Sequence, residues 1–402
     1  TLPSAKNIDS FIPMDIRREV GLPLPSDKSD IYAYHFYRLL QRAKNINLIY
    51  NSDTDKLGSG EKSRFILQIE NELDKVNPNI KLINNVIITE IVNSETKESK
   101  SSIIEVKKDR NILNKIFAIS ESGYSASLFN NFITCPLKFY FSQILRLKTS
   151  TSLEQSVEPN TFGTIIHAVL EDIYKPFTGN EIDIIEIKKS LKNVRSFLSL
   201  KFKEYYSNGN ISSGKNLLTF EVAVNYISNF LKWDIKNLHN NPSILLSTEV
   251  KIINELDLGS GKINFKGVID RIDKRIYDGR IRIIDYKTGK VEHKDLKVKN
   301  TDDLTNNPSY SKAFQVSYYA WLLAEQYKDQ EFDTGIISTR SLSNGFIPLV
   351  LQEYDNISEY FGEFTESINH MVCKISDPDT PFTQTTDLNM CEWCDYKSIC
   401  NR

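Results

Sequence analysis

Apolar residues in the first hundred positions repeat mostly at helical spacing. Residues 30–45 (DIYAYHFYRLLQRAKN) and 63–76 (SRFILQIENELDKV) show this spacing, which predicts two amphipathic helices. The apolar run at 47–51 (NLIYN) predicts a short strand between them. Residues 1–110 are therefore expected to form one unit that contains both helices and strands.

From about residue 120 the predicted helices and strands come in mixed order. Helical spacing predicts helices at 162–175, 183–206, 215–238, 311–327 and 357–372. Apolar runs and alternation predict strands at 244–254, 262–277, 280–286, 334–340 and 346–354. This order predicts an α/β domain over residues 120–402, in which helices flank one central mixed sheet.

Composition excludes several classes of protein. The 402 residues are 40% hydrophobic and 25% charged, which is typical of folded globular proteins and leaves room for two domains. Fifty basic and 52 acidic residues give a net charge of −2, so a uniformly basic coat is excluded, although a local basic groove is not. No apolar run approaches the roughly 20 residues of a membrane helix, and no signal peptide precedes the first segment. A cytoplasmic protein is expected, and the missing initiator Met suggests a piece of a longer chain.

A predicted hairpin brings acidic side chains together. Asp270 lies on its first strand, and Asp285-Tyr286-Lys287 ends the second. Since side chains alternate along a strand, Asp285 and Lys287 point to the same face, and the expected pairing brings Asp270 beside them. Two carboxylates suit a divalent cation such as Mg²⁺ or Mn²⁺, which polarises a phosphodiester and activates water, and a lysine offsets developing charge.

The simpler interpretation of a D-x-K sequence is a surface hairpin with an ordinary Asp–Lys pair. Asp285, however, directly follows the apolar run IRII, which is typical of a buried strand. A carboxylate at the end of such a strand is costly to bury without a partner. This favours a functional role for Asp285.

Three of the five cysteines lie close together near the end of the sequence. Cys391, Cys394 and Cys400 form a C-x2-C-x5-C pattern, and Cys135 lies far upstream. Clustered thiols in a chain with no sign of secretion suggest metal ligands before disulfides. Cys373, in the apolar run HMVCKI, is expected to be a small buried hydrophobic residue.

Five segments, in one order, resemble the RecB-like branch of the PD-(D/E)XK nucleases. They are SASLFNNFITCPLKFYF, FGTIIHAVLE, GVID with IIDYKTGK, QVSYYAWLL and CEWCDYKSIC, and they span residues 125–400. Ile269 replaces the proline that some members have, which leaves the acidic ligand unchanged. The resemblance implies a restriction-endonuclease-like fold and metal-dependent hydrolysis of DNA.

The same resemblance implies roles for individual residues. The implied metal ligands are His167, Asp270, Asp285 and the backbone carbonyl of Tyr286. Lys287 would position water or stabilise transition-state charge, and Gln315 and Tyr319 would orient Lys287 and the DNA backbone. Alone, His167 would be interpreted as a structural or solvent-facing residue, and Gln315 and Tyr319 could simply pack on the sheet. Glu249, on the preceding strand, is a further residue that could assist the site.

The cysteine pattern resembles the four-cysteine site of AddB-type nucleases. There, an early cysteine and a terminal C-x2-C-x5-C hold a [4Fe–4S] cluster, which implies Cys135, Cys391, Cys394 and Cys400 as ligands. Four thiolates also suit Zn²⁺, so a zinc ribbon is the alternative. A zinc ribbon usually has two C-x2-C pairs, so a lone cysteine with a distant triplet favours iron–sulfur. Such a cluster would join the two ends of the nuclease domain.

Residues 1–110 resemble the last part of the helicase-like region of AddB-type subunits. FIPMDIRREVGLP and YAYHFYRLLQRAKNINLIYN are the similar segments, with Arg42 where UvrD-like helicases have the arginine of a T-R-A motif. Gln41 replaces the usual threonine. The sequence contains no G-x-x-x-x-G-K-[ST], so no phosphate-binding loop for ATP is expected.

Together these features predict the C-terminal part of a helicase–nuclease subunit for DNA repair or recombination. We expect it to cut DNA, with a preference for single-stranded ends, and to work with a partner subunit. Four lysines after the catalytic motif could line a phosphate path or form a solvated face: Lys290, Lys294, Lys297 and Lys299. The alternatives are a degenerate nuclease fold that only binds DNA and a scaffold that docks a partner.

Overall fold

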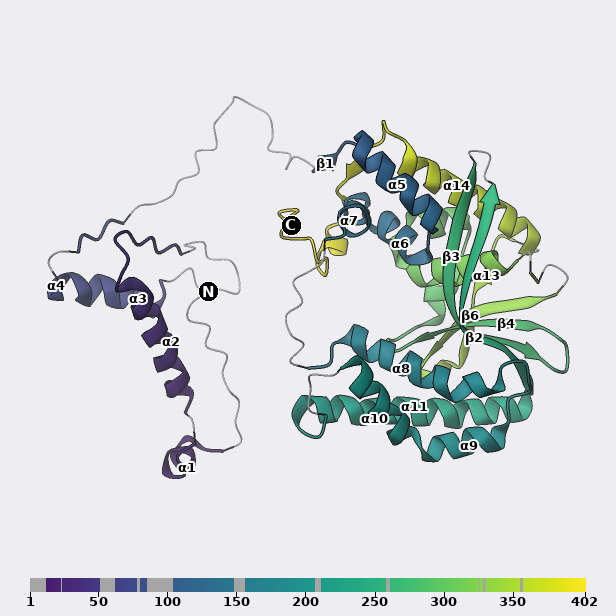
Figure 1. Cartoon of the computed structure of the whole chain (residues 1–402), viewed down its shortest axis with the longest axis horizontal. Helices are drawn as coiled ribbons and strands as arrows, with labels where there is room; N and C mark the ends of the chain where they lie inside the picture. The colour runs from purple at the N-terminus through teal and green to yellow at the C-terminus, as the bar shows by residue number, and fades with distance from the viewer. Residues whose placement is uncertain are drawn as a thin grey trace. The chain divides into compact units, whose positions relative to one another are not determined.

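The structure, a computed structural model, describes residues 12–22, 24–50, 62–77, 80–84, 104–147, 156–206, 211–257, 261–324, 326–327, 330–354 and 357–402. The chain divides into two compact units, Thr1–Glu98 and Ser99–Arg402. Figure 1 shows both units, and each is treated by itself below.

The first unit consists of short helical segments around a small aromatic core. They are α1 (Met14–Glu19), α2 (Pro25–Leu40), α3 (Arg64–Gln68), the π-helical turn Ile69–Leu73 and α4 (Asp74–Val76). Phe36 and Phe65 stack with their ring centroids 4.9 Å apart, and Ile69 completes the buried cluster. The predicted helix at 30–45 ends at Leu40, so Arg42 lies beyond it and is exposed.

The strand predicted at 47–51 is wrong for residues 47–50, which form no strand, and residue 51 lies outside the described part. A strand needs a neighbour for its backbone N–H and C=O groups. The sheets of the structure contain no strand from the described residues of this unit. The apolar run is therefore exposed, with Ile49 at 79%.

A five-stranded mixed sheet lies at the centre of the second unit. Its strands follow the order β2 (Ser243–Asp257), β3 (Lys262–Arg275), β4 (Ile281–Lys287), β6 (Phe332–Ser338) and β7 (Phe346–Pro348). Neighbouring strands are antiparallel, except that β4 and β6 are parallel. The parallel pair requires a crossover, and the helix α13 (Ser311–Leu323) lies within it. The predicted α/β architecture with one central sheet is confirmed.

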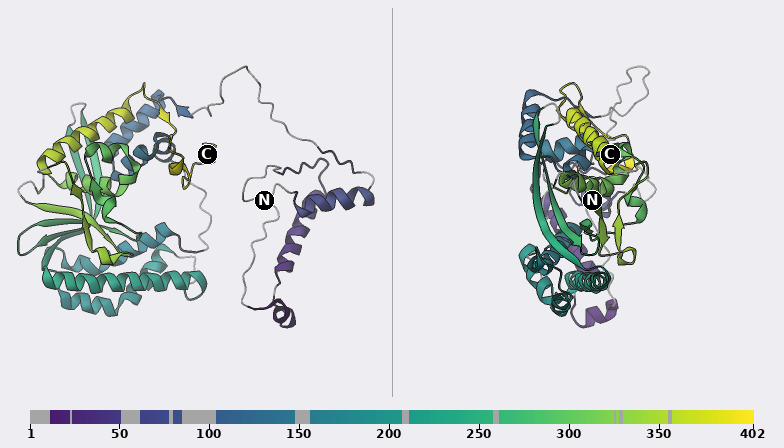
Figure 2. Two further views of the ribbon diagram at one scale, coloured as in Figure 1. Left: turned by 180° about the vertical axis from the view of Figure 1, so that it is seen from behind. Right: turned by 90° about the vertical axis from the view of Figure 1, so that its right-hand side faces the viewer.

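Helices cover both faces of this sheet (Figures 1 and 2). One layer packs around a core that includes Ile166, Phe230 and Tyr286, and it consists of α8 (Pro159–Tyr174), α9 (Ile184–Lys192), α10 (Val194–Tyr205) and α11 (Gly214–Asn240). The opposite layer packs around Phe265 and Phe314, and it consists of α5 (Arg110–Ser122), α6 (Ala126–Thr134), α13 and α14 (Ile357–Ser376). Burial of these apolar faces is the main term that stabilises the unit.

The remaining elements of the second unit are short. They include several 3-10 turns and β1 (Glu105–Val106), α7 (Pro136–Phe139), the π-helical turn Tyr140–Ile144, β5 (Lys297–Val298), α12 (Thr301–Asn306), β8 (Val350–Leu351) and β9 (Phe382–Thr383). β1 pairs with β9, which brings the start of the unit against its C-terminal segment. No helix in the described part of the chain is both long and apolar enough to cross a membrane.

Two predicted elements are each divided in the structure. The helix predicted at 183–206 breaks at Asn193, whose carbonyl accepts the backbone N–H of Ser196 and Phe197 and so begins a second helix. The strand predicted at 346–354 becomes β7 and β8, and β8 pairs with β5 in a separate sheet. Leu349 N still donates to Thr334 O at 2.8 Å, and β7 ends because the chain then leaves β6 to pair with β5.

Candidate active site

Asp270 and Asp285 face each other on the two central antiparallel strands. Arg271 of β3 pairs with Ile284 of β4, which places the two aspartates opposite each other at the next register position. Both are buried, with Asp285 only 2% exposed. Asp270 Oδ2 accepts the backbone N–H of Tyr286 at 2.6 Å, so this carboxylate takes the place of a ladder carbonyl. The carboxylate positions are therefore fixed by the backbone of both strands.

Three side chains from three elements converge on one point beside Asp270. His167 Nδ1, from α8, lies 3.2 Å from Asp270 Oδ1 and 3.7 Å from Glu249 Oε1. One ligand atom from each of the three lies within 4.8 Å of the others, and in the described part of the chain this is the group able to hold a metal ion. Such spacing suits direct ligands of a single ion.

Glu249 reaches this group through an unusual backbone conformation. It lies on β2 between the registered pairs Thr248↔Arg271 and Val250↔Ile269, and so opposite Asp270. Its φ of 45° is in the left-handed region, which most residues avoid. Such conformations cluster at functional sites. The sequence predicted Glu249 on this strand but contained no signal for the backbone conformation that directs its side chain towards His167 and Asp270.

On the other side of Asp285, polar side chains form a continuous chain of contacts. Gln315 Oε1 accepts from Lys287 Nζ at 2.9 Å, and Gln315 Nε2 donates to Asp285 Oδ1 at 3.0 Å. The same amide nitrogen lies 2.9 Å from the Tyr319 hydroxyl oxygen. The structure therefore brings Gln315 and Tyr319 of α13 against Asp285 and Lys287.

Lys287 Nζ also lies 2.9 Å from Asp285 Oδ2, which makes them an ion pair. The angle at this contact does not meet that of a hydrogen bond, so Oδ2 is a buried acceptor that no donor in the described part of the protein satisfies. An oxygen in this condition is available to a cation. The backbone carbonyl of Tyr286 remains a predicted ligand.

Charge and burial shift the pKa values of two of these groups. Burial alone would lower the pKa of His167, but the charge of Asp270, its hydrogen bond and that of Glu249 raise the pKa to about 10. Burial raises the pKa of Asp285 to about 6; the Lys287 ammonium opposes this rise and the Asp270 charge reinforces it. Both shifts follow from crowding carboxylates together in a site with little water.

The donor set fits a hard divalent cation. Carboxylate oxygens from Glu249, Asp270 and Asp285 are the ligands that Mg²⁺ and Mn²⁺ prefer, and one imidazole is better suited to Mn²⁺ than to Mg²⁺. The raised His167 pKa reflects the same crowding, because a proton on the imidazole neutralises part of the carboxylate charge.

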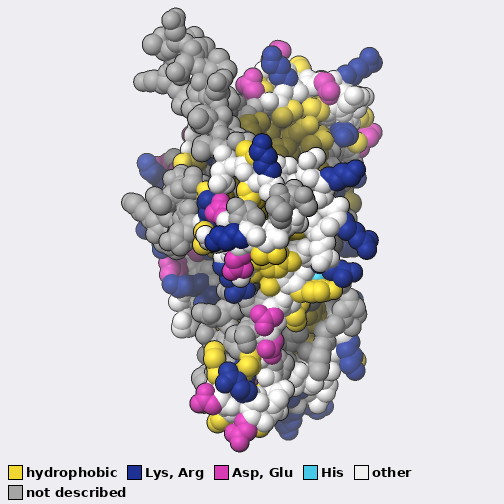
Figure 3. Space-filling view, turned by 90° about the vertical axis from the view of Figure 1, so that its left-hand side faces the viewer, with side chains coloured by type: hydrophobic (Ala, Val, Ile, Leu, Met, Phe, Trp, Pro, Cys, Tyr) yellow, Lys and Arg dark blue, Asp and Glu magenta, His cyan; other side chains and the backbone are white. Residues whose placement is uncertain are grey.

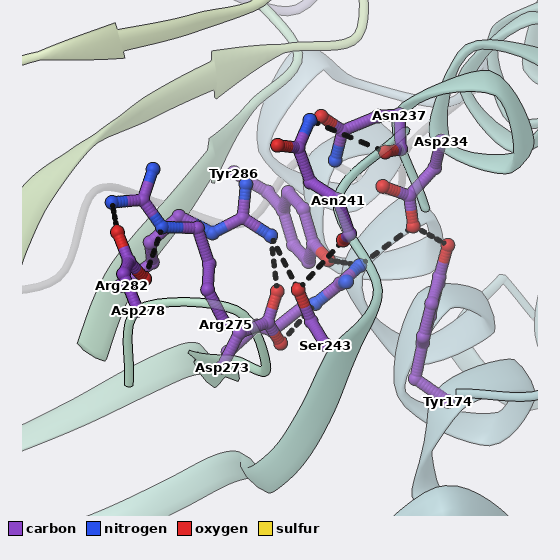
Figure 4. A network of polar contacts seen from close by, with 11 residues as sticks. Tyr174, Asp234, Asn237, Asn241, Ser243, Asp273, Arg275, Asp278, Arg282 and Tyr286 are labelled. Carbon is purple, nitrogen blue, oxygen red and sulfur yellow. Dashed lines mark hydrogen bonds and ion pairs between the residues drawn. The ribbon is translucent and has the colours of Figure 1, made fainter. Parts of the chain in front are cut away.

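A network of buried charged side chains connects β3 and β4 to α8 and α11 (Figure 4). Arg271 lies 2.9 Å from Asp234 Oδ2 and 2.8 Å from Asp273 Oδ1, and the Tyr174 hydroxyl donates to Asp234 at 2.5 Å. Arg282 lies 3.0 Å from Asp273 Oδ2. No sequence pattern predicts this network, because a single charged residue on a strand has the same pattern whether its partner is a protein side chain or water.

The lysines after the catalytic motif do not form a free basic row. Lys290 and Lys294 both pair with Glu292, and Lys299 lies 3.4 Å from Glu353 Oε1. Three of the four lysines are thus paired with carboxylates, as is common on a solvated face. Figure 3 shows basic and acidic side chains interspersed over one face of the molecule.

The four predicted cluster cysteines line one small hollow: Cys135, Cys391, Cys394 and Cys400. No three of them, however, form a group as close as the one at His167. The [4Fe–4S] cluster therefore remains a prediction. The prediction for Cys373 is wrong: this residue is exposed on α14, and its sulfur contacts Asn369 one turn earlier. The apolar residues beside it, Met371 and Val372, occupy the buried face.

Comparisons with known proteins give the family. A protein of Rickettsia felis (strain ATCC VR-1525 / URRWXCal2) described as an uncharacterized protein is 23% identical over 260 residues, which is 63% of this chain and 28% of that protein. The match thus spans less than a third of that relative. A solved structure named "Crystal structure of SSO0001" is 13% identical, with 66% of this chain and 93% of that chain covered and a TM-score of 0.25. The model of the PD-(D/E)XK nuclease superfamily matches residues 124–401, a span that includes every residue of the site above, and the chain belongs to this superfamily.

Proposed function

We propose that this chain is a metal-dependent deoxyribonuclease of the RecB/AddB type. The observation that supports this most strongly is the group of His167, Glu249 and Asp270, whose ligand atoms lie within 4.8 Å of one another. Asp285 and Lys287 lie beside this group on β4, so metal ligands and a cation are available at one place. Hydrolysis of a phosphodiester needs both.

The ion would be held by side chains from four elements: His167, Glu249, Asp270 and Asp285, with the Tyr286 carbonyl as a further ligand. When bound, Mg²⁺ or Mn²⁺ polarises the phosphodiester and lowers the pKa of a water molecule. Lys287 orients the attacking water or stabilises charge on the phosphate oxygens, and Gln315 holds its ammonium in place. Tyr319 fixes the orientation of the Gln315 amide.

Cleavage of labelled DNA tests this proposal directly. The purified protein should degrade single-stranded DNA in Mg²⁺ or Mn²⁺, and EDTA should abolish the activity. Duplex DNA with single-stranded ends serves as the second substrate. Binding without cleavage, in either metal and with intact wild-type protein, would instead identify a DNA-binding module with a degenerate nuclease fold.

The cysteine hollow is proposed to hold a [4Fe–4S] cluster. In a zinc site, ligand bonds of about 2.3 Å place the sulfurs about 3.8 Å apart. No three of the four thiols approach within 4.8 Å of one another, although all line the same hollow. In a [4Fe–4S] cluster each thiolate binds a different iron, so the sulfurs lie further apart. Iron and sulfide assays on anaerobically purified protein test this, and stoichiometric zinc without iron would reject it.

The cellular role is proposed from the resemblance of both units. A helicase-like segment followed by a nuclease domain suits a helicase–nuclease that processes DNA ends in repair or recombination, together with a partner subunit. Without a phosphate-binding loop in its sequence, this chain should not bind ATP, and the motor activity would lie elsewhere. Isothermal calorimetry with ATP checks this, and saturable binding would show that the first unit has been misinterpreted.

A further inference from the structure

A second cavity lies along β3, apart from the metal ligands. It has a volume of about 390 Å³, and its lining comes from the α5–α6 connection, β3 and the segment after the π-helical turn. Two cations, Arg146 and Lys266, line it together with Ser125, Ser142 and Gln143. No carboxylate occurs in the described lining. Two cations without a carboxylate suit an anionic ligand.

The side chain of Lys266 is fixed in position beside this cavity. Its aliphatic stem lies against Gly123, where an added Cβ would approach Lys266 Cδ to 3.2 Å. Gly123 also has a φ of 96°, which favours glycine for a second reason. Lys266 Nζ donates to the Ser122 carbonyl at 2.9 Å. One of its three N–H groups is thus used for positioning, and the other two remain for a ligand.

Arg146 is held in a strained conformation at the other side of the cavity. Its φ of 52° lies in the left-handed region, which is unfavourable for a residue with a long side chain. Hydrogen bonds fix the backbone on both sides: Leu145 N donates to Tyr140 O, and Leu147 N donates to Phe141 O, each at 2.9 Å.

The C-terminal cysteine segment also contributes, because the Tyr396 hydroxyl donates to Leu147 O at 3.0 Å. No ion pair or hydrogen bond to the Arg146 guanidinium exists among the residues that the structure describes. A strained backbone that presents an unpaired cation beside a cavity is best explained by a ligand for that cation.

The cavity lies close enough to the catalytic centre for one bound DNA strand to contact both. Lys266 and Asp270 are four residues apart on β3, which places them about 13 Å apart along the strand. A nucleic-acid strand extends over this distance within a few nucleotides. We propose that Arg146 and Lys266 bind a backbone phosphate of the DNA strand that the catalytic site cuts. This inference rests on the proposed nuclease function.

Substitution of both cations tests the inference. Arg146→Asn removes the charge while keeping a residue that tolerates positive φ, and Lys266→Gln removes the second charge. Binding of labelled single-stranded DNA is followed by anisotropy in EDTA over a range of salt concentrations, and KM is measured in Mg²⁺. Lys192→Gln, at an exposed lysine on α9, is the matched control for charge.

The double variant should bind DNA about tenfold more weakly and should lose about 0.7 from the slope of log affinity against log salt, which corresponds to one phosphate contact on a single strand. Lys192→Gln should change neither. KM should rise while kcat stays within a few-fold of wild type, because the cations contact the strand away from the cut bond.

Oligonucleotides with one neutral methylphosphonate locate the contact. In the wild type, one position a few nucleotides from the cut should weaken binding, and the double variant should be insensitive there. If the double variant matches Lys192→Gln on DNA, or only its inhibition by inorganic phosphate changes, the inference is wrong. If the wild type neither binds nor cuts DNA, the proposed function itself fails.

Discussion

His167 illustrates how crowded carboxylates set the charge of a neighbouring group. In the folded protein its pKa is about 10, against an ordinary value of 6.5, because two carboxylates outweigh the effect of burial. Between these two pH values the imidazole holds a proton that an incoming metal ion must displace. Metal affinity should therefore rise as pH increases from 6.5 towards 10, by up to about tenfold per pH unit.

Calorimetric titration with Mn²⁺ in buffers of different ionisation enthalpy measures this proton release. Release of about one proton near neutral pH is expected for the wild type, and His167→Ala should release much less and bind Mn²⁺ more weakly. An affinity that does not change with pH would show that His167 is not a ligand.

Asp285 makes the stability of the folded protein depend on pH. Its pKa of about 6 exceeds the ordinary 3.8, so the folded state holds this proton more tightly than the unfolded state does. Without metal, the free energy of unfolding should thus fall as pH rises from 3.8 to 6. Asp285→Asn removes this buried charge and should melt at a higher temperature than wild type at pH 8 in EDTA. The gain should be only about 1 kcal/mol, because Lys287 loses its partner at the same time. Equal melting temperatures at pH 8 would refute this.

At the level of elements, the buried ion network joins the helix that presents His167 to the strands that present the carboxylates. Tyr174 lies two turns after His167 on α8 and donates to Asp234 of α11, which pairs with Arg271 of β3. Arg271 and Asp234 are 1% and 2% exposed, so removal of one partner leaves an uncompensated buried charge. Asp234→Ala should lower the free energy of unfolding by about 3 kcal/mol.

Urea denaturation measures this change, and the exposed pair of Arg195 and Glu221 provides the control. These two side chains are 62% and 38% exposed, so Glu221→Ala should cost much less stability than Asp234→Ala. Equal costs for the two variants would mean that the buried network does not stabilise the layer that contains α8.

The sequence predicted the central hairpin because its signals are local. Apolar alternation, the YDGR turn and the position of Asp285 after IRII together set the strands and their facing residues. The left-handed backbone of Glu249 and the partners of Arg271 depend on contacts between distant elements, and no local pattern encodes them. Residues 47–50 show the reverse case: their local preference for a strand is not realised, because no neighbouring strand pairs with them in the described part of the chain.

At the scale of the whole molecule, the cysteines connect the start of the nuclease unit with its end. Cys135 lies between α6 and α7, and the other three lie in the last dozen residues. A cluster that joins them closes a loop of over 250 residues, which restricts the unfolded chain by about 5 kcal/mol. Cys394→Ala should therefore lower the melting temperature sharply under anaerobic conditions.

Differential scanning calorimetry checks this effect, with Cys373→Ala as the control because Cys373 is an exposed thiol outside the hollow. The control should melt as wild type does and keep its full content of iron and sulfide. A Cys394→Ala variant with unchanged stability would mean that the cysteines hold no structural cluster.

The central claim is that Asp285 and Lys287 are, respectively, a metal ligand and a catalytic cation. Paired metal titration and DNA cleavage on Asp285→Ala and Lys287→Ala test it most directly. We expect Asp285→Ala to lose both metal binding and cleavage, and Lys287→Ala to bind metal and DNA while its turnover falls by orders of magnitude. If Asp285→Ala cuts DNA as well as the wild type does, these residues are not the active site.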